Sequence, residues 1–219
     1  MNKITIRKGI LKNIQYSHTI KDDEYNKADL IVKRKDGKED LINIRFKKFS
    51  NNYKENDEID LTGNIRSYSQ HLDSGKNSVE LYVFTYFDQP EDVVEDENTP
   101  TNLVEIDGRI CKKDELRKTH SGKHNLHFVI ANNIITNDKS QKLNSYLPTI
   151  AWGKIAREMS KLPISTKVKI VGELHSREYK KELGNGDIEI RVARELVVNS
   201  YEVVEEDKAE EIPAESIEA

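Results

Sequence analysis

The feature that most constrains the fold is a strand pattern that occurs three times with a glycine in the same position. It reads IDLTGNI at residues 59–65, VEIDGRI at 104–110 and VKIVGEL at 168–174. Alternation of apolar and polar residues indicates β-strands with one buried face. A glycine inside such a strand marks a sharp bend or a close approach of two backbones, as the corners of small barrels require. We therefore expect short strands that curve into closed barrels.

The same pattern belongs to an internal repeat of about 100 residues. Gly63 and Gly75 are separated by the same interval as Gly172 and Gly184, and an alternating strand follows each pair. The best helix signal is Gly153–Lys161, whereas the corresponding segment of the first repeat, Lys47–Asp57, is loop-like. Five strands with a short helix after the third is the order of an OB-fold barrel. The predicted fold is all-β, with two tandem five-stranded OB-fold barrels and the helix in the second.

Charge is distributed unevenly along the chain and indicates the domain boundaries. Residues 101–200 carry 18 Lys/Arg and 12 Asp/Glu, although the whole chain has a net charge of −4. The acidity lies in 89–100, which has two prolines and no periodicity, and in 201–219, which is poor in aromatic residues. We expect one barrel in 1–88, an acidic linker in 89–100, the second barrel in 101–200 and a disordered acidic tail in 201–219.

Several classes of protein are disfavoured by the composition. The single cysteine, Cys111, rules out an internal disulfide framework, and no stretch is long and apolar enough for a membrane span. His120, His124 and His127 lack the ligand spacing of a zinc site, and the acidic run Asp22–Glu24 fits a solvated turn better than a nuclease site. The sequence predicts a cytoplasmic protein that is not an enzyme and has no cofactor or metal.

The second repeat resembles a known family. GRICKKDELRKTHSGKHNLHFVIA (Gly108–Ala131), AWGKIAREM (Ala151–Met159) and VKIVGELHSREY (Val168–Tyr179) are similar, in order and spacing, to bacterial single-stranded DNA-binding proteins. The resemblance covers about 100 residues, nearly half of the chain. It implies an OB-fold that holds single-stranded DNA by base stacking and phosphate contacts. The first repeat keeps the architecture but few of the motif residues.

The resemblance implies stacking positions at Tyr146, Trp152 and Tyr179 in the second barrel. A further aromatic residue that the family carries after its second strand is missing, because the loop Asn132–Gln141 holds no ring. Phosphate contacts are expected from basic residues near these rings, namely Lys112, Arg117, Lys123, Lys154 and Arg177. In the first barrel the candidate counterparts of these rings are Phe46, Phe49, Tyr53 and Tyr68. Core packing is the expected role of Phe46, whereas Tyr53 and Tyr68 are the candidates for DNA contact. The alternative is that the rings pack a core or a subunit interface and that the charges only keep a hairpin in solution.

The function predicted is binding of single-stranded DNA with little sequence preference, which protects it during replication, recombination or repair. The alternative is that the first barrel is a protein-interaction or dimerisation module in a replication or DNA-transfer complex. The family commonly assembles four OB-folds, so the resemblance implies a homodimer. Replication or repair proteins are possible partners of the acidic tail, which ends in Ser216-Ile217-Glu218-Ala219 without a terminal aromatic residue.

Overall fold

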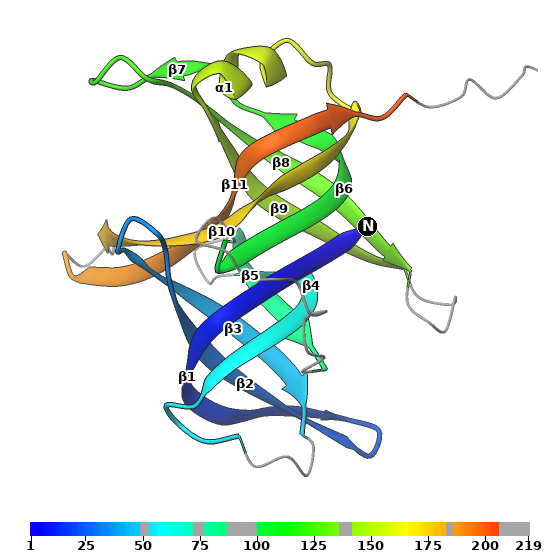
Figure 1. Cartoon of the computed structure of the whole chain (residues 1–219), viewed down its shortest axis with the longest axis vertical. Coiled ribbons are helices and arrows are strands. Elements are labelled where there is room, and N and C mark those ends of the chain that lie inside the picture. The colour runs from blue at the N-terminus through cyan, green and yellow to red at the C-terminus, as the bar shows by residue number, and fades with distance from the viewer. Residues whose placement is uncertain (49–52, 72–76, 87–99, 136–141, 183–185, 206–219) are drawn as a thin grey trace, which may run out of the picture.

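The computed structural model describes residues 1–48, 53–71, 77–86, 100–135, 142–182 and 186–205, which form two barrels stacked end to end (Figure 1). The N-terminal barrel consists of β1 (Asn2–Ile20), β2 (Asp23–Lys33), β3 (Glu39–Lys47), β4 (Glu58–His71) and β5 (Asn77–Thr85). The C-terminal barrel consists of β6 (Asn102–Lys113), β7 (Arg117–Lys118), β8 (His124–Ile135), β9 (Lys142–Trp152), α1 (Gly153–Met159), β10 (Lys167–Glu182) and β11 (Ile188–Val203).

Both barrels close by the same set of strand pairings. In the first, β1 pairs with β2 and β4, β2 with β3, β4 with β5, and β3 runs parallel to β5. In the second, β6 pairs with β8 and β10, β8 with β9, β10 with β11, and β9 runs parallel to β11. β7 is a short addition that pairs with β8. The prediction of two tandem OB-fold barrels, with α1 after the third long strand of the second, is confirmed.

The repeated glycines are places where the neighbouring strand passes very close. A Cβ on Gly172 would lie 2.1 Å from the carbonyl oxygen of Val197, and one on Gly63 would lie 2.6 Å from that of Phe84. Val197 belongs to β11 and Phe84 to β5, so both glycines meet the last strand of their own barrel. A side chain in either position would push that strand away, which explains why the glycine recurs.

Alternate residues of the strands point inward and form the hydrophobic core. Ile4, Ile6, Ile42, Ile44 and Leu61 are fully buried in the first barrel. The second barrel also has fully buried residues on its strands: Val104, Ile106, Ile130, Leu147 and Ile170. At about 1.5–3 kcal/mol for each fully buried aliphatic side chain, these rows dominate the stability of both barrels. The other residues of each strand, which alternate with these, therefore point to the outside of the barrel.

The two barrels share one continuous sheet because their first strands pair with each other. β1 and β6 run antiparallel with Ile4 opposite Val104, Asn2 opposite Ile106 and Ile6 opposite Asn102. β1 thus pairs with β6, the strand that occupies the same place in the second barrel. Equivalent residues of these two strands are 100 positions apart in the sequence, and Ile4 and Val104 are both equivalent and paired. The barrels are therefore related by a local pseudo-two-fold axis through the Ile4–Val104 pair, as in an isologous contact.

A second contact between the barrels is polar and largely shielded from solvent. The carboxylate of Asp40, which has no exposed surface, accepts two hydrogen bonds from Arg34, at 2.7 and 2.8 Å, and one from the backbone N–H of Ser176 at 2.6 Å. The Ser176 hydroxyl accepts a bond from the backbone N–H of Leu41. Asp40 and Leu41 belong to β3 and Ser176 to β10, so the β10–β11 hairpin is fastened to the side of the first barrel (Figure 1).

The outer strands of the C-terminal barrel show how far it extends along the chain. β6 begins at Asn102, and β11 continues to Val203, three residues past the expected end at 200. Most of the expected linker and of the acidic tail falls in 87–99 and 206–219, outside the described residues. Within the described part of the chain, no helix is both long enough and apolar enough to cross a membrane.

Candidate nucleic-acid interface

The outer face of the C-terminal barrel is formed by β8 and β9. Tyr146 and Trp152 lie on β9, six positions apart and therefore on the same side of the strand. At about 3.3 Å per residue they stand roughly 20 Å from each other. Their register partners on β8 are Ala131 and Asn125, so the surface between the two rings is made of two extended strands. This surface could support several consecutive nucleotides.

Trp152 lies at the point where β9 ends and α1 begins. Its ring is half-buried, and the ammonium nitrogen of Lys123 lies 5.2 Å from the ring centre. Arg117 on β7 pairs with Asn125, which in turn pairs with Trp152, so the basic turn lies beside the ring. The fold therefore brings together three predicted site residues: Arg117, Lys123 and Trp152. A base stacked on Trp152 would have cations within reach of its phosphates.

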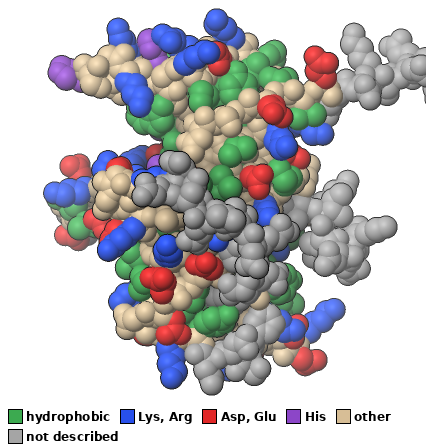
Figure 2. All heavy atoms as spheres, viewed as in Figure 1, with side chains coloured by type: hydrophobic (Ala, Val, Ile, Leu, Met, Phe, Trp, Pro, Cys, Tyr) green, Lys and Arg blue, Asp and Glu red, His purple; other side chains and the backbone are tan. Residues whose placement is uncertain are grey.

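Two further predicted cations flank this surface. Lys154 stands in the first turn of α1 with 81% of its side chain exposed, 3.6 Å from Glu158. Lys112 is exposed on β6, opposite Val129 of β8. Figure 2 shows Lys, Arg and His side chains gathered on the part of this barrel that holds β7 and α1. Part of the basic character expected from the sequence of 101–200 therefore lies on the same end of the barrel as Trp152.

Asn125 is a candidate that the sequence did not reveal. Its side-chain oxygen is buried and has no hydrogen-bond partner among the described residues. The residue is the register partner of Trp152 and stands between that ring and Arg117. A buried amide without a partner is uncommon, and here it borders the predicted stacking position. No sequence pattern distinguishes Asn125, because an asparagine inside a strand is ordinarily a polar residue on the outward side.

Tyr179 and Arg177 lie on the β10–β11 hairpin, away from β8 and β9. The Arg177 guanidinium lies 5.9 Å from the centre of the Tyr179 ring, which is 37% exposed. Arg177 also lies 3.7 Å from Glu195, whose carboxylate is 3.8 Å from His127 on β8. The hairpin thus carries a ring and a cation of its own, and Glu195 lies between Arg177 and His127 of the main surface.

Tyr146 lies at the seam between the barrels. Its backbone N–H donates a 2.8 Å hydrogen bond to the hydroxyl of Ser67 on β4 of the first barrel. Its ring is 46% exposed, and that of Tyr68, the next residue after Ser67, is 51% exposed. Two predicted stacking residues, one from each barrel, therefore belong to strand segments that touch. The outer surfaces of both barrels approach each other here.

The outer face of the N-terminal barrel carries a group of rings and cations that the sequence analysis largely missed. Arg45 on β3 lies 4.1 Å from the ring centre of Tyr82 and 5.7 Å from that of Tyr68. Arg66 on β4 lies 3.9 Å from the ring centre of Phe84. The group continues through ring contacts of Phe84 with Tyr86 and Tyr25, and of Tyr25 with His18. Cation–π pairs of this kind leave an aromatic surface bordered by positive charge.

A signal for this group was present in the sequence. LYVFTYF at residues 81–87 places Tyr82, Phe84 and Tyr86 on one side of a strand by simple alternation. Of the residues that were named for this barrel, Tyr68 belongs to the group. Tyr53 is half-buried and packs against the hydrophobic core, as does the buried Phe46. Phe49 lies outside the described residues.

The loop after β8 is described only in part. The described residues Asn132–Ile135 hold no aromatic side chain, and 136–141 are outside the described part. Asn132 is buried and serves the contact between the barrels: its amide donates to the carbonyl oxygen of Asp107 at 2.6 Å, and its oxygen accepts from Asn2 at 2.8 Å. This part of the expected loop therefore has an architectural role.

Comparisons with known proteins agree with the tandem-barrel fold. Residues 101–204 match the model of the "Single-strand binding protein family". The whole chain is similar to the wild-type single-stranded DNA binding protein from Thermus aquaticus, with 15% identity, a TM-score of 0.68 and 95% of each chain covered. It is similar to a deletion mutant of that protein, with 16% identity, a TM-score of 0.69, and 96% of this chain and 98% of the other covered. A search of the curated proteins found no match.

Proposed function

We propose that this chain, a tandem OB-fold protein whose residues 101–204 match the model of the single-strand binding protein family, binds single-stranded DNA through both of its barrels. The observation that carries the proposal is the pairing of partly exposed rings with cations on both outer faces. Lys123 stands over Trp152 in one barrel, and Arg45 stands over Tyr68 and Tyr82 in the other. The Thermus aquaticus proteins that share this fold are single-stranded DNA binding proteins.

Such surfaces suit a single strand because each unpaired base offers a flat face. Stacking on an aromatic side chain contributes about 1–3 kcal/mol per base and tolerates any base, so the grip has little sequence preference. The nearby cations contact the phosphates, and release of counterions makes the affinity fall as salt rises. Lys154, Arg117 and Lys112 are exposed and take this part in the C-terminal barrel.

The protein acts as a binding protein and not as an enzyme in this proposal. Coating a strand keeps it unpaired and protected during replication, recombination or repair. Each chain has two barrels, and the resemblance implies an assembly of four OB-folds. The functional form would therefore be a homodimer. Replication or repair proteins are the proposed partners of the acidic tail. A cytoplasmic location follows from this role.

The test uses the sole tryptophan, Trp152, whose fluorescence reports directly on the proposed stacking position. We expect thymine oligonucleotides to quench it at low salt, with an affinity that falls steeply at high salt, and a duplex of the same length to bind much more weakly. Absence of quenching together with an affinity indifferent to salt would overturn the proposal.

A further inference from the structure

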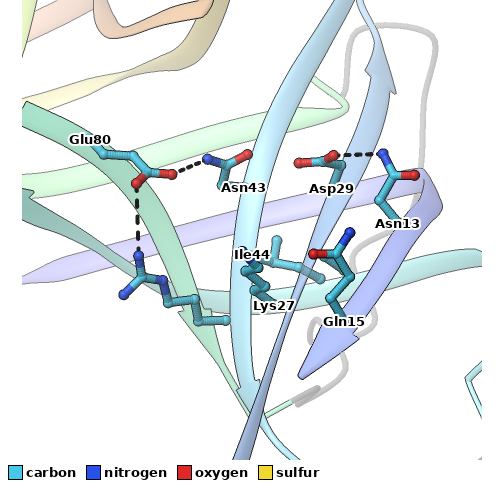
Figure 3. A pocket seen from close by; sticks show the side chains of 9 residues that line it. Asn13, Gln15, Lys27, Asp29, Asn43, Ile44 and Glu80 are labelled. Carbon is cyan, nitrogen blue, oxygen red and sulfur yellow. Dashed lines mark hydrogen bonds and ion pairs between the residues drawn. The ribbon is translucent and has the colours of Figure 1, made fainter. Parts of the chain in front are cut away.

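A polar cavity of about 240 Å³ opens on the outer face of the N-terminal barrel (Figure 3). It lies over β2 and β3, the face with which OB-folds bind oligonucleotides, and extends onto β1 and β5. Its polar lining comes from Asn13, Gln15, Lys27, Asp29, Asn43 and Glu80, together with Arg45. The volume is below the roughly 300–1,000 Å³ of sites for whole small molecules, so one flat ring is the natural occupant.

One side of the cavity is already occupied by contacts within the protein. The amide of Asn43 donates to Glu80, and Arg45 lies 3.8 Å from the same carboxylate. The oxygen of the Asn43 amide accepts a 2.7 Å hydrogen bond from Arg194, which reaches across from β11 of the other barrel. Burial lowers the pKa of Arg194, against the opposing effect of the Glu80 and Asp29 carboxylates. This side of the cavity belongs to the contact between the barrels.

The other side offers unused hydrogen-bonding groups. One oxygen of Asp29 accepts a 2.9 Å bond from Asn13, which leaves its second oxygen open. Among the described residues, the side chains of Gln15 and Lys27 have neither a hydrogen bond nor an ion pair, and both residues are exposed. Figure 3 shows Asp29, Lys27 and Gln15 around one side of Ile44. A carboxylate oxygen of Asp29, the amide of Gln15 and the ammonium group of Lys27 therefore lie close together and can all form hydrogen bonds with a ligand.

The cavity also adjoins the rings of the proposed DNA-binding face. Arg45 lines it and holds its guanidinium against Tyr82 and Tyr68. A strand stacked on these rings would bring the edge of a base to Asp29, Gln15 and Lys27. Stacking alone does not distinguish bases, whereas hydrogen bonds to base edges do.

We infer that this cavity reads a base that carries an exocyclic amino group and discriminates against thymine, an inference that rests on the proposed function. Carboxylates accept hydrogen bonds from the amino groups of bases, as Asp and Glu do from cytosine. The neighbouring carbonyl or ring nitrogen of the base meets Lys27 or Gln15, which can donate. Thymine has no amino group, and the one donor on its pairing edge, the N3–H, is flanked by two carbonyl oxygens, so its approach to the Asp29 carboxylate brings both oxygens toward the same negative charge. The cavity thus adds a base preference to a grip that otherwise tolerates any sequence.

The experiment measures the affinity of the full chain for fluorescein-labelled oligonucleotides by anisotropy at one salt concentration. The probes are a thymine tract and tracts of the same length in which alternate thymines are replaced by cytosine, adenine or guanine. We expect at least one substituted tract to bind about tenfold more tightly than the thymine tract, since a well-made base contact discriminates by that order.

The variant Asp29→Asn should remove this preference, and Gln15→Ala, at an exposed position, should reduce it if Asp29→Asn does not fold. The matched control is Asp36→Asn, which makes the same change of charge in the turn between β2 and β3, where the side chain is 51% exposed. It should keep the preference. Equal affinity of all tracts, or a preference that survives both cavity variants, would overturn the inference while single-strand binding stands. Failure of every tract to bind would instead overturn the proposed function.

Discussion

Asn2 and Asn102 occupy equivalent positions in the two barrels and make the same pair of hydrogen bonds. The Asn2 amide donates to the carbonyl oxygen of Ile65 and its oxygen accepts from the N–H of Ile65, both at 2.8 Å. Asn102 does the same with Leu174, at 2.6 and 3.2 Å. Ile65 and Leu174 each follow the repeated glycine of their barrel by two residues. The repeat thus extends to individual hydrogen bonds at the strand pair that joins the barrels.

Asn102→Ala is expected to lower the free energy of unfolding by about 2–4 kcal/mol, because it leaves two buried backbone groups of Leu174 without partners. The measurement is urea denaturation followed by circular dichroism. Asn144→Ala, at an exposed position of the same barrel, is the control and should change stability by less than about 0.5 kcal/mol. Equal losses in the two variants would contradict the assignment.

Asp40→Ala should destabilise the contact between the barrels. The substitution removes a fully buried carboxylate and leaves Arg34 and the N–H of Ser176 without their acceptor. Breaking a buried pair from one side costs about 3–5 kcal/mol, and urea denaturation would show a loss of that order. Asp36→Ala, in the exposed turn of the same hairpin, should have almost no effect. A native-like stability of Asp40→Ala would show that this contact is dispensable.

Trp152→Ala should weaken binding of a thymine oligonucleotide by about 5- to 150-fold, which corresponds to the 1–3 kcal/mol of one stacked base. Trp152→Phe keeps a ring beside Lys123 and should retain most of the affinity. Because both variants lack the fluorescent reporter, the measurement is anisotropy of a labelled oligonucleotide. Similar affinities of the alanine variant and the unmodified protein would place the stacking elsewhere.

Tyr68→Ala tests whether the N-terminal barrel contacts DNA. Its exposed ring, next to Arg45 at 5.7 Å, should contribute about 1–3 kcal/mol to binding, and Tyr68→Phe should preserve that contribution. Competition binding with an unlabelled oligonucleotide provides the comparison. If neither variant changes the affinity, the barrel is better described as a protein-interaction or dimerisation module.

Lys154→Ala should reduce the salt dependence of binding. A cation that meets one phosphate of a single strand contributes about 0.7 to the slope of log affinity against log salt, and Lys154 has 81% of its side chain exposed for this purpose. Lys38→Ala, with 71% exposure in the turn between β2 and β3, is the control and should leave the slope unchanged. An unchanged slope in both variants would remove Lys154 from the interface.

Much of the fold could be predicted because its determinants are local. The alternation around Gly63, Gly108 and Gly172, and the helix before Pro163, are visible in short windows of sequence. The contact between the barrels was not predictable in this way. It joins Asp40 to Ser176 and Asn2 to Asn132, residues that are far apart along the chain and paired only by the final geometry.

The candidate site was predicted less completely for a different physical reason. In β5 both sides of the strand are apolar, with Leu81 and Val83 buried in the core and Tyr82 and Phe84 on the other side. Alternation alone does not say which side faces outward, so this aromatic group was overlooked. Trp152 and Lys123 were found because the family resemblance marked them, whereas Asn125 became visible only through its buried and unpartnered oxygen.

The antiparallel pairing of β1 with β6 has a consequence for the direction of a bound strand. A pseudo-two-fold axis at Ile4 and Val104 inverts every direction that lies along the sheet. A DNA strand that runs straight from one outer face to the other would therefore travel 5′ to 3′ on one barrel and 3′ to 5′ on its counterpart, as judged from equivalent residues. Two identical barrels could not both hold such a strand in their preferred polarity. Because the two barrels are joined in one chain, their sequences can differ. One barrel can therefore bind the DNA strand in the direction that is set by its binding to the other barrel.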